Sequence, residues 1–303
     1  MEIRTLRYFV EIAHQKSFTL AAERLFVTQP TLSRQIAELE EELGQVLFDR
    51  STRRVTLTEK GLYLLRQAES ILALLDRTKK EAMSKSELMG ELVICAAETP
   101  SFDIVAEVIH EFLTIHPSVQ YRFISANSQD TADRLRTGLA DFGLMMLPSD
   151  LDGFEYLEIP RLNQWGVLTR RDGCFKGRTR IHAEDLKDIP LFFSRQPFEN
   201  RFAGWLGHPF AELNIIGRYN LLYNVSRIVR MGGQHALCLD GIIGEDDELM
   251  FLPLEPAFQV GCVIAWPRVR AKRLVTEVFL ESLRKKIIEE NRRLVLSSEE
   301  KQD

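Results

Sequence analysis

The sequence lacks the features of a secreted, disulfide-stabilised protein. Its four cysteines, Cys95, Cys174, Cys238 and Cys262, include no CxxC pair. The first residues, MEIR, begin no apolar stretch of the kind that a signal peptide needs. These absences predict a protein of the reducing cytoplasm.

Long hydrophobic runs are also missing. The densest apolar patch is residues 71–75, whereas a bilayer span needs roughly 18 apolar residues. A membrane span is therefore excluded at this stage. An apolar content of 45% in 303 residues is enough for about two domains, each with its own core.

Catalytic and metal-binding motifs are absent too. The six histidines show no metal-ligand spacing, and neither a GxSxG elbow nor a GxxxxGK[ST] loop occurs. We therefore expect no catalytic residues, no metal and no cofactor. Cys238 is a candidate redox-sensing thiol, although its apolar neighbours favour a buried structural cysteine.

The chain has no overall excess of positive charge. Lysine and arginine total 39 and aspartate and glutamate 44, which gives a net charge of −5 and a pI near 5.8. Residues 1–60 are neutral, residues 61–90 carry +1 and the remainder carries −6. A polyanion such as nucleic acid would have to be bound by a local patch.

The pattern of apolar and polar residues changes near residue 90. The first ninety residues show helical periodicity, one proline and a single β-like stretch at 54–58, which predicts a small helical domain with a hairpin. After the polar junction 84–90, short β-rich runs alternate with helical patterns, which predicts an α/β domain. The expected strands are 92–96, 119–125, 142–146, 165–169, 191–194, 215–219, 236–239 and 262–265, and helices are expected at 102–116 and 128–138.

A helix pair in the first domain carries a polar, exposed face. The second of its helices begins with Thr28 as cap and has Pro30 in its first turn, where a missing N–H costs nothing. Leu32, Ile36, Leu39 and Leu43 form its apolar stripe. The opposite face, small and hydrogen-bonding at its N-terminal end, is typical of a recognition helix in the major groove. The acidic run 38–42 must lie outside that groove, because it would repel phosphate.

A basic hairpin follows this helix. Arg50, Arg53 and Arg54 lie between a turn and a β-branched stretch, so they can form a wing that reaches sugar-phosphate or the minor groove. Helix pairs occur in many folds, and an arginine cluster can simply be a solvated loop. The order of helix pair, polar helix face and basic hairpin favours DNA binding.

The same residues closely resemble the winged helix-turn-helix of LysR-type transcriptional regulators. The resemblance lies in LRYFV (6–10), SFTLAAERL (17–25), VTQPTLSRQI (27–36), LEEELG (39–44) and LFDR (47–50), and it extends over residues 1–61. It implies a winged helix-turn-helix domain over 1–60 with the helix-turn-helix at 18–37. It also implies that Gln29, Pro30, Ser33 and Arg34 face base edges, that Thr28 and Thr31 face phosphates, and that Arg50 and Arg53 make the wing contacts.

An apolar stripe predicts a long linker helix over residues 58–84. Leu62, Leu65, Ala68, Leu72 and Leu75 recur at helical spacing, and the helix would be roughly 40 Å long. The stripe can pack against its own domain. The resemblance implies instead an antiparallel pairing with a second subunit, which gives a homodimer or homotetramer on a pseudo-palindromic double-stranded DNA operator.

For the remainder, the resemblance implies an effector-binding domain over 92–303, after a hinge at 85–91. The expected fold is a two-lobed, periplasmic-binding-protein-like α/β domain, so the whole chain is α/β with an all-α N-terminal winged helix-turn-helix and linker helix. Strand crossings are expected near 159–165 and 263–268. Lobe I would hold 92–161 and 267–303, and lobe II would hold 162–266.

A small-molecule effector is expected in the cleft between the lobes, where helix N-termini and strand ends favour anions. The candidate effector contacts are Thr99, Ser101, Ser128, Ser194, Arg195 and Asn224. Residues of these types at helix starts also serve simply as caps. Arg195 would be the first contact of a carboxylate effector, whereas Arg218, Arg227 and Arg230 form either a second anion site or a solvated helix face.

The sequence therefore predicts a DNA-binding transcriptional regulator, not an enzyme, whose operator binding is modulated by a small-molecule effector, with an anion as one option for its class. RNA polymerase is a further partner that this reading allows. The alternative is a solute-binding or sensory protein whose N-terminal domain only mediates oligomerisation. An α/β enzyme ranks third.

Overall fold

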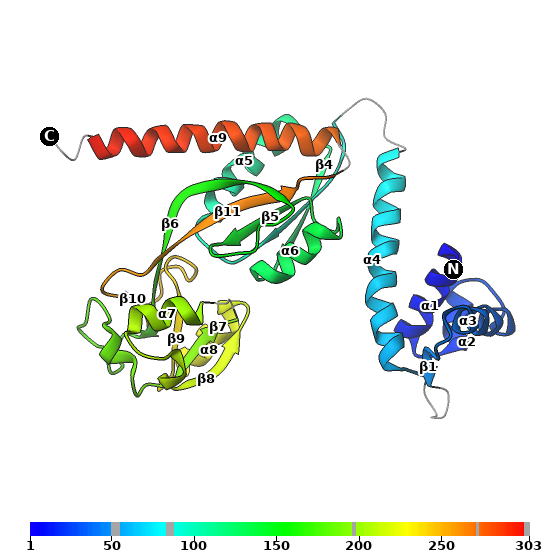
Figure 1. Cartoon of the computed structure of the whole chain (residues 1–303), viewed down its shortest axis with the longest axis horizontal. Coiled ribbons are helices and arrows are strands. Elements are labelled where there is room, and N and C mark those ends of the chain that lie inside the picture. The colour runs from blue at the N-terminus through cyan, green and yellow to red at the C-terminus, as the bar shows by residue number, and fades with distance from the viewer. Residues whose placement is uncertain (50–54, 83–87, 196–197, 271–272, 300–303) are drawn as a thin grey trace. The chain divides into compact units, whose positions relative to one another are not determined.

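The computed structural model describes residues 1–49, 55–82, 88–195, 198–270 and 273–299. The chain divides into two compact units, Met1–Lys85 and Ser86–Asp303 (Figure 1).

The first unit is a helical domain with a short hairpin. Its elements are α1 (Ile3–Gln15), α2 (Phe18–Arg24), α3 (Gln29–Leu43), β1 (Phe48–Asp49), β2 (Thr56–Leu57) and α4 (Glu59–Ala82). Phe9, Leu32 and Ile36 are fully buried, and the Phe9 and Phe48 rings lie 5.2 Å apart. Ala21 and Ala22 of α2 are also buried, because their small side chains let neighbouring helices approach closely.

The corner between the hairpin and α4 is closely packed. Thr58 Oγ1 donates a hydrogen bond to the carbonyl of Val46 at 2.7 Å and accepts one from the Gly61 N–H at 3.0 Å. A Cβ added at Gly61 would lie 2.2 Å from the carbonyl oxygen of Leu47. The sequence needs glycine here because the first turn of α4 crosses the backbone next to β1.

The apolar residues of α4 include a buried group and an exposed group. Ala68 and Leu72 are buried in the core of the first unit. Tyr63, Ile71 and Leu74, which share one flank of the helix, are 61%, 40% and 39% exposed. The stripe therefore packs partly against its own domain, and a second apolar flank, the Tyr63–Ile71–Leu74 flank, remains on the surface of this unit.

The second unit is built on one continuous mixed sheet. Its strands are β3 (Gly90–Ala96), β4 (Val119–Ser125), β5 (Phe142–Met146), β6 (Phe154–Arg170), β7 (Leu191–Ser194), β8 (Ile215–Tyr219), β9 (His235–Leu239), β10 (Leu249–Pro253) and β11 (Gln259–Pro267). The strand order is β4-β3-β5-β11-β6-β9-β7-β8, with β10 paired to β6. The strands β3, β4 and β5 run parallel, as do β7, β8 and β9.

Two long strands join the two halves of this sheet. The first part of β6 pairs with β11, whereas residues from Trp165 to Arg170 pair with β9 and β10. In β11, Cys262 is already opposite Met146 of β5. The second crossing therefore lies N-terminal to the predicted position at 263–268, because β10, which was not expected, is the last strand of the second lobe and leads almost directly into β11.

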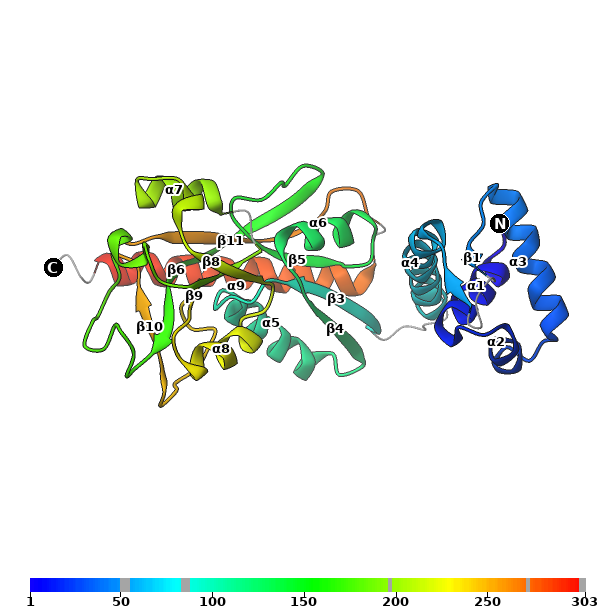
Figure 2. The same ribbon diagram turned by 90° about the horizontal axis from the view of Figure 1, so that it is seen from below.

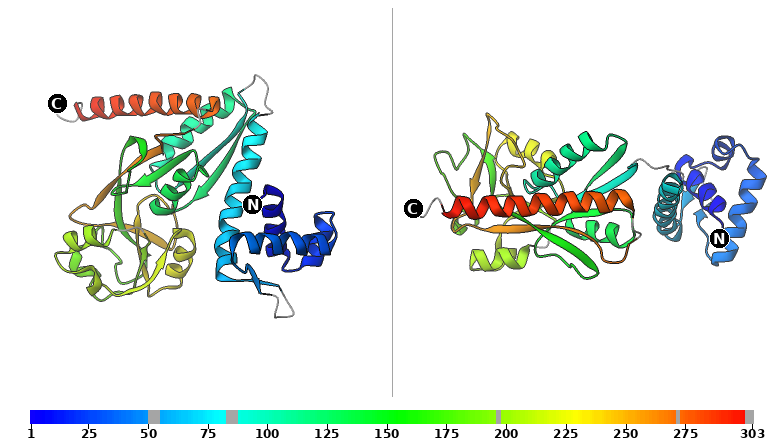
Figure 3. Two further views of the ribbon diagram at one scale, coloured as in Figure 1. Left: turned by 45° about the vertical axis from the view of Figure 1, so that its right-hand side comes forward. Right: turned by 90° about the horizontal axis from the view of Figure 1, so that it is seen from above.

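Helices cover both faces of each lobe (Figures 2 and 3). In lobe I, α5 (Phe102–Ile115) and α9 (Leu274–Glu299) pack on the face that carries Leu92 and Ile94. The other face, with Val93 and Cys95, is covered by α6 (Ser128–Arg136). In lobe II, α8 (Leu222–Met231) and α7 (Glu199–Leu206) lie on opposite faces, and short 3₁₀ turns occur at Ala183–Leu186 and Phe210–Glu212.

The predicted fold class is confirmed, with a helical N-terminal unit and a two-lobed α/β unit. Within the described part of the chain, no helix is both long and apolar enough to cross a membrane. The described residues also contain no group of three or more potential metal ligands.

Candidate nucleic-acid interface and ligand cleft

Both helices of the α2–α3 pair are capped at their N-termini by local hydrogen bonds. Ser17 Oγ caps α2 by accepting from the N–H of Leu20 at 3.3 Å. Phe26 adopts a left-handed conformation with φ of 55° and is 95% exposed. Thr28 Oγ1 then caps α3 by accepting from the N–H of Thr31 at 3.4 Å. The two helices of the motif are thus joined by a short turn, as the sequence predicted.

One face of α3 is free of the core. Leu32, Ile36 and Leu39 are buried, and the N-terminal residues opposite them are open to solvent. Thr28, Gln29, Pro30, Thr31 and Arg34 are exposed and Ser33 is half-buried. The Arg34 side chain is 73% exposed, and its Nε lies 3.5 Å from Glu38 Oε1. Hydrogen-bond donors and hydrogen-bond acceptors can therefore both reach a partner from the N-terminal end of α3.

The acidic run at the C-terminal end of α3 includes a structural residue. Glu40 Oε1 accepts hydrogen bonds from the N–H groups of Leu47 and Phe48 at 2.7 and 3.1 Å. This carboxylate ties α3 to β1 and so sets the position of the hairpin next to the helix. The sequence pattern indicated only a charged surface at this position.

The hairpin forms at its base, where Phe48 pairs with Leu57 and Asp49 with Thr56. The three predicted wing residues, Arg50, Arg53 and Arg54, lie outside the described residues.

Two of the predicted effector contacts belong to a buried polar cluster at the strand crossing. Thr99 Oγ1 donates to Asn163 Oδ1 at 2.6 Å, and Ser101 Oγ lies 3.0 Å from the same oxygen. The Asn163 amide group donates to Ser101 Oγ at 2.8 Å and to the carbonyl of Val260 at 3.2 Å. These bonds join the loop after β3 to both crossing strands, β6 and β11.

The other predicted effector contacts are dispersed. Ser128 is buried at the start of α6, behind the cap Asn127. Ser194 lines a small pocket between the lobes. Arg195 is exposed, and its backbone N–H donates to the carbonyl of Tyr219 at 2.8 Å. Asn224 is exposed within the first turn of α8. The structure thus brings Thr99 and Ser101 together and places Ser194 at the pocket between the lobes, whereas Ser128, Arg195 and Asn224 do not line that pocket.

The cleft between the lobes contains a carboxylate that the sequence analysis did not single out. Glu98, in the loop after β3 of lobe I, accepts a hydrogen bond from the N–H of Leu222 at 2.8 Å. Leu222 is the first residue of α8 in lobe II. Glu98, Trp165, Ser194, Tyr219 and Asn220 line the pocket at this junction. The signal for Glu98 in the sequence was its position directly before Thr99, in the loop that follows β3.

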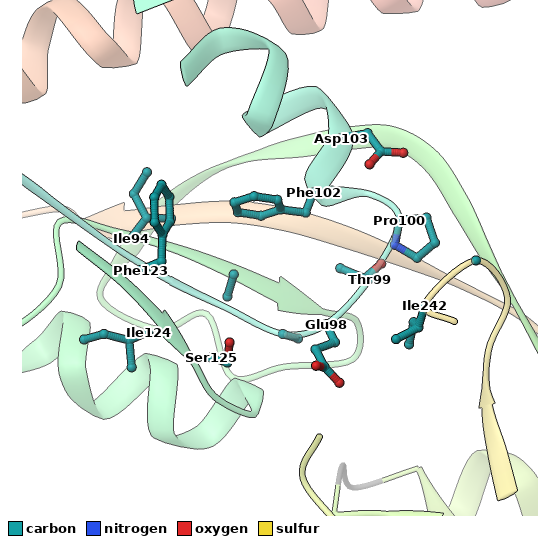
Figure 4. A pocket seen from close by; sticks show the side chains of 13 residues that line it. Ile94, Glu98, Thr99, Pro100, Phe102, Asp103, Phe123, Ile124, Ser125 and Ile242 are labelled. Atoms are coloured by element: carbon teal, nitrogen blue, oxygen red, sulfur yellow. The ribbon is translucent and has the colours of Figure 1, made fainter. Parts of the chain in front are cut away.

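A larger pocket of about 380 Å³ adjoins this junction on the lobe I side. Figure 4 shows the Phe102 side chain extending toward Phe123, with Glu98 and Asp103 on opposite sides of the loop that carries Thr99 and Pro100. The two rings are 6.1 Å apart in an edge-to-face arrangement. Ile242, from the loop after β9 of lobe II, also lines this pocket.

Several other residues singled out in the sequence are either buried or paired with carboxylates of the chain. Cys238 is buried in β9, and burial raises the pKa of its thiol. Arg230 pairs with Asp246 and with Glu248 at 3.0 Å, and Arg218 pairs with Glu199 at 2.8 Å. Arg218 and Arg230 are therefore paired with carboxylates of the chain itself, whereas Arg227 is exposed on α8.

Comparisons with known proteins agree with this architecture. A model of the lysR family of bacterial regulatory helix-turn-helix proteins matches residues 3–62, and a model of the LysR substrate binding domain matches residues 85–287. The transcriptional regulator TfdT of Cupriavidus pinatubonensis is 36% identical over 200 residues, which are 63% of this chain and 84% of TfdT. The regulator IlvY of Escherichia coli K12 is 34% identical over 242 residues, 78% of this chain and 77% of IlvY.

Solved structures show the same fold. A crystal structure of CbnR, a LysR family transcriptional regulator, gives a TM-score of 0.75 at 22% identity and covers 95% of this chain and 99% of CbnR. Full-length CbnR in complex with its target DNA gives a TM-score of 0.73 at 21% identity, over 94% of this chain and 100% of that chain.

A winged helix-turn-helix joined to a two-lobed α/β domain defines a DNA-binding protein that responds to a small ligand. The chain belongs to the LysR family. It is therefore a DNA-binding transcriptional regulator with a substrate-binding domain, as the resemblance of its first 61 residues implied.

Proposed function

We propose that the N-terminal face of α3 reads a specific operator. In this proposal Gln29, Pro30, Ser33 and Arg34 contact base edges, and Thr28 and Thr31 contact phosphates. Arg50, Arg53 and Arg54 of the wing contact the flanking backbone or minor groove. The observation that carries the proposal is the exposed polar face of α3 opposite its buried stripe of Leu32, Ile36 and Leu39.

Two copies of the chain would bind DNA together. A second α4 helix covering the Tyr63–Ile71–Leu74 flank would remove its apolar surface from water and pair two recognition helices. An operator read in this way has approximate two-fold symmetry, with half-sites separated by whole turns of DNA. A tetramer, as a dimer of such dimers, would extend the contacts to a longer site. The working compartment would be the cytoplasm, where the operator is.

The effector would act by binding different arrangements of the two lobes with different affinity. Glu98 and Leu222 support this step, because they form a hydrogen bond between the lobes at the pocket itself.

The operator proposal is tested by binding of the full-length protein to the intergenic DNA next to its gene. Arg34→Ala should weaken binding by about five- to 150-fold if Arg34 reads a base, since such a contact is worth about 1–3 kcal/mol. If Arg34 instead holds a phosphate, the affinity falls for all sequences and the salt dependence becomes shallower.

The matched control is Arg4→Ala, which removes an exposed arginine from α1 and so from the same unit. Equal affinity of Arg34→Ala and wild type at matched salt would refute the assignment of α3. Failure of the wild type to discriminate this DNA from random DNA would favour the alternative of a sensory protein with an oligomerising N-terminal domain.

A further inference from the structure

The two pockets of the second unit adjoin each other at Glu98 and are together referred to as the cleft. Both are lined by Ala97, Glu98 and Ile242. The smaller part faces lobe II, at Tyr219 and Leu222, and the larger part extends over lobe I to Phe102 and Phe123 (Figure 4). A volume of about 380 Å³ in the larger part is in the range of small-molecule sites.

The charge of this cleft is negative. Among the described residues that line it, the charged ones are Glu98 and Asp103, and none is lysine or arginine. Asp103 is neutralised by Arg161, whose Nη1 lies 2.7 Å from its carboxylate and 2.9 Å from the carbonyl of Pro100. No cationic side chain that the structure describes pairs with Glu98, which accepts a hydrogen bond from the neutral N–H of Leu222. Glu98 therefore supplies the net charge of the pocket.

One of the helix N-termini that favoured an anionic effector is already occupied by a carboxylate of the protein. The N-terminus of α8 is a favourable place for a carboxylate, since its N–H groups and the helix dipole point toward the cleft. Glu98 itself fills that place at 2.8 Å from the N–H of Leu222. Arg195, the expected counter-ion of a carboxylate effector, does not line either pocket. A second carboxylate would meet the repulsion of Glu98 with no compensating cation from the lining residues.

The rest of the pocket suits the apolar body of a cation. The rings of Phe102 and Phe123 meet edge to face, and Ile94 and Ile242 complete an apolar wall. Aromatic faces attract ammonium and guanidinium groups, and a carboxylate adds a charge-assisted hydrogen bond. One oxygen of Glu98 accepts from Leu222, and a carboxylate has further lone pairs for a second donor.

We infer that this cleft binds a small organic cation, an amine or guanidinium on an apolar body, with Glu98 as its counter-ion. The inference rests on the proposed function only in placing the effector in this domain, and it departs from the anionic effector that the sequence suggested. A cation that draws Glu98 away from Leu222 would change a contact between the lobes. This gives the ligand a direct route to the lobe arrangement.

The test uses the full-length protein and matched ligand probes. Phenethylamine, 3-phenylpropanoate and 2-phenylethanol share one apolar body and differ in charge, and agmatine represents the guanidinium class. Binding is followed by thermal shift and by tryptophan fluorescence, because Trp165 lines the cleft. We expect at least one of the two cations to give a saturating response, and the anion and the alcohol to give none at the same concentration.

Glu98→Gln is the decisive variant, because it removes the charge and retains an oxygen that can accept from Leu222. It should weaken cation binding by about tenfold or more, as expected for loss of a charge-assisted hydrogen bond. The control is Glu111→Gln, which removes the same charge from an exposed position of α5 and should leave binding unchanged.

Binding of 3-phenylpropanoate in preference to the cations would overturn the inference. So would the absence of a saturating response to either cation at millimolar concentration, or equal cation affinity of Glu98→Gln and wild type. Operator binding is measured in parallel without ligand. A failure of DNA binding then counts against the proposed function, and a failure of cation binding counts against this inference alone.

Discussion

At the scale of single residues, the corner between β1 and α4 depends on the absence of one methyl group. Gly61→Ala would place a Cβ 2.2 Å from the backbone oxygen of Leu47. Relief requires movement of the backbone, so we expect the first unit to lose about 1–3 kcal/mol, even after the gain of about 1 kcal/mol in helix propensity. Urea denaturation of the variant measures the loss.

The control for this substitution is Gly204→Ala in α7, where no atom lies within 4 Å of the added Cβ. There the propensity gain should stand alone, with unchanged or slightly raised stability. If both alanines have the same effect, the close approach at Gly61 is not what requires glycine.

His235 makes stability depend on pH. It is buried at the start of β9, its Nδ1 lies 2.8 Å from Thr169 Oγ1, and burial lowers its pKa below the usual value of 6.5. The unfolded chain therefore takes up a proton before the folded chain does. Stability is unaffected by this group above pH 6.5 and falls as the pH falls below that value.

Thermal unfolding at about pH 7.5 and about pH 5.5 tests this linkage. His235→Gln keeps a hydrogen-bonding side chain and removes the titration, so its melting temperature should fall less between the two pH values than that of the wild type. An equal fall in both proteins would show that other groups cause the acid sensitivity.

At the scale of elements, α4 has two apolar flanks, one packed on its own domain and one that we assign to a second copy of the chain. Ala68 and Leu72 hold the helix to its own domain, whereas Ile71 and Leu74 lie on the exposed flank assigned above to a second copy. Leu74→Glu should therefore weaken dimerisation by about tenfold or more, because a charge would be buried against an apolar partner. Sedimentation at several protein concentrations gives the dissociation constant.

Ala73→Glu is the matched control, since residue 73 is exposed on the same helix but lies about 100° around the helix axis from Leu74, outside the Tyr63–Ile71–Leu74 flank. It should leave the oligomeric state and the melting temperature of the protein unchanged. Dimerisation equal to wild type in Leu74→Glu would mean that another surface pairs the subunits.

At the scale of the whole molecule, the residues proposed to contact DNA and those proposed to bind the ligand lie in different units of the chain. The positive groups that face DNA in this proposal are confined to Arg34 and to Arg50, Arg53 and Arg54, while the remainder of the chain after residue 90 carries the net charge of −6. In the second unit, β6 and β11 both pass between the lobes, and the buried Asn163 cluster joins them to the loop that carries Glu98. Changes in the cleft therefore act directly on the segments that connect the lobes.

Much of the fold follows from local patterns. Strands β4, β5, β7 and β8 have the expected bounds, because each is a short run, bounded by turn residues, in which most residues are apolar or aromatic. The recognition helix and its cap at Thr28 were also predictable, since capping and helical periodicity are properties of neighbouring residues. By contrast, β10 was not expected, because residues 249–253 are short and end in proline, and pairing with the distant β6 stabilises them as a strand.

The sequence by itself determined the family and the exposed face of α3, because these depend on spacing along a few turns of chain. Only the tertiary structure decided what surrounds the effector candidates. Thr99 and Ser101 were chosen for their place after a strand, but their hydroxyls bond to Asn163, which lies more than 60 residues away. Thr99 and its neighbour Glu98, which the sequence did not single out, both line the larger pocket, and Glu98 bonds to Leu222 of the other lobe. Local patterns single out this loop, whereas the crossing of β6 and β11, which are distant in the sequence, decides which partner each of its side chains bonds to.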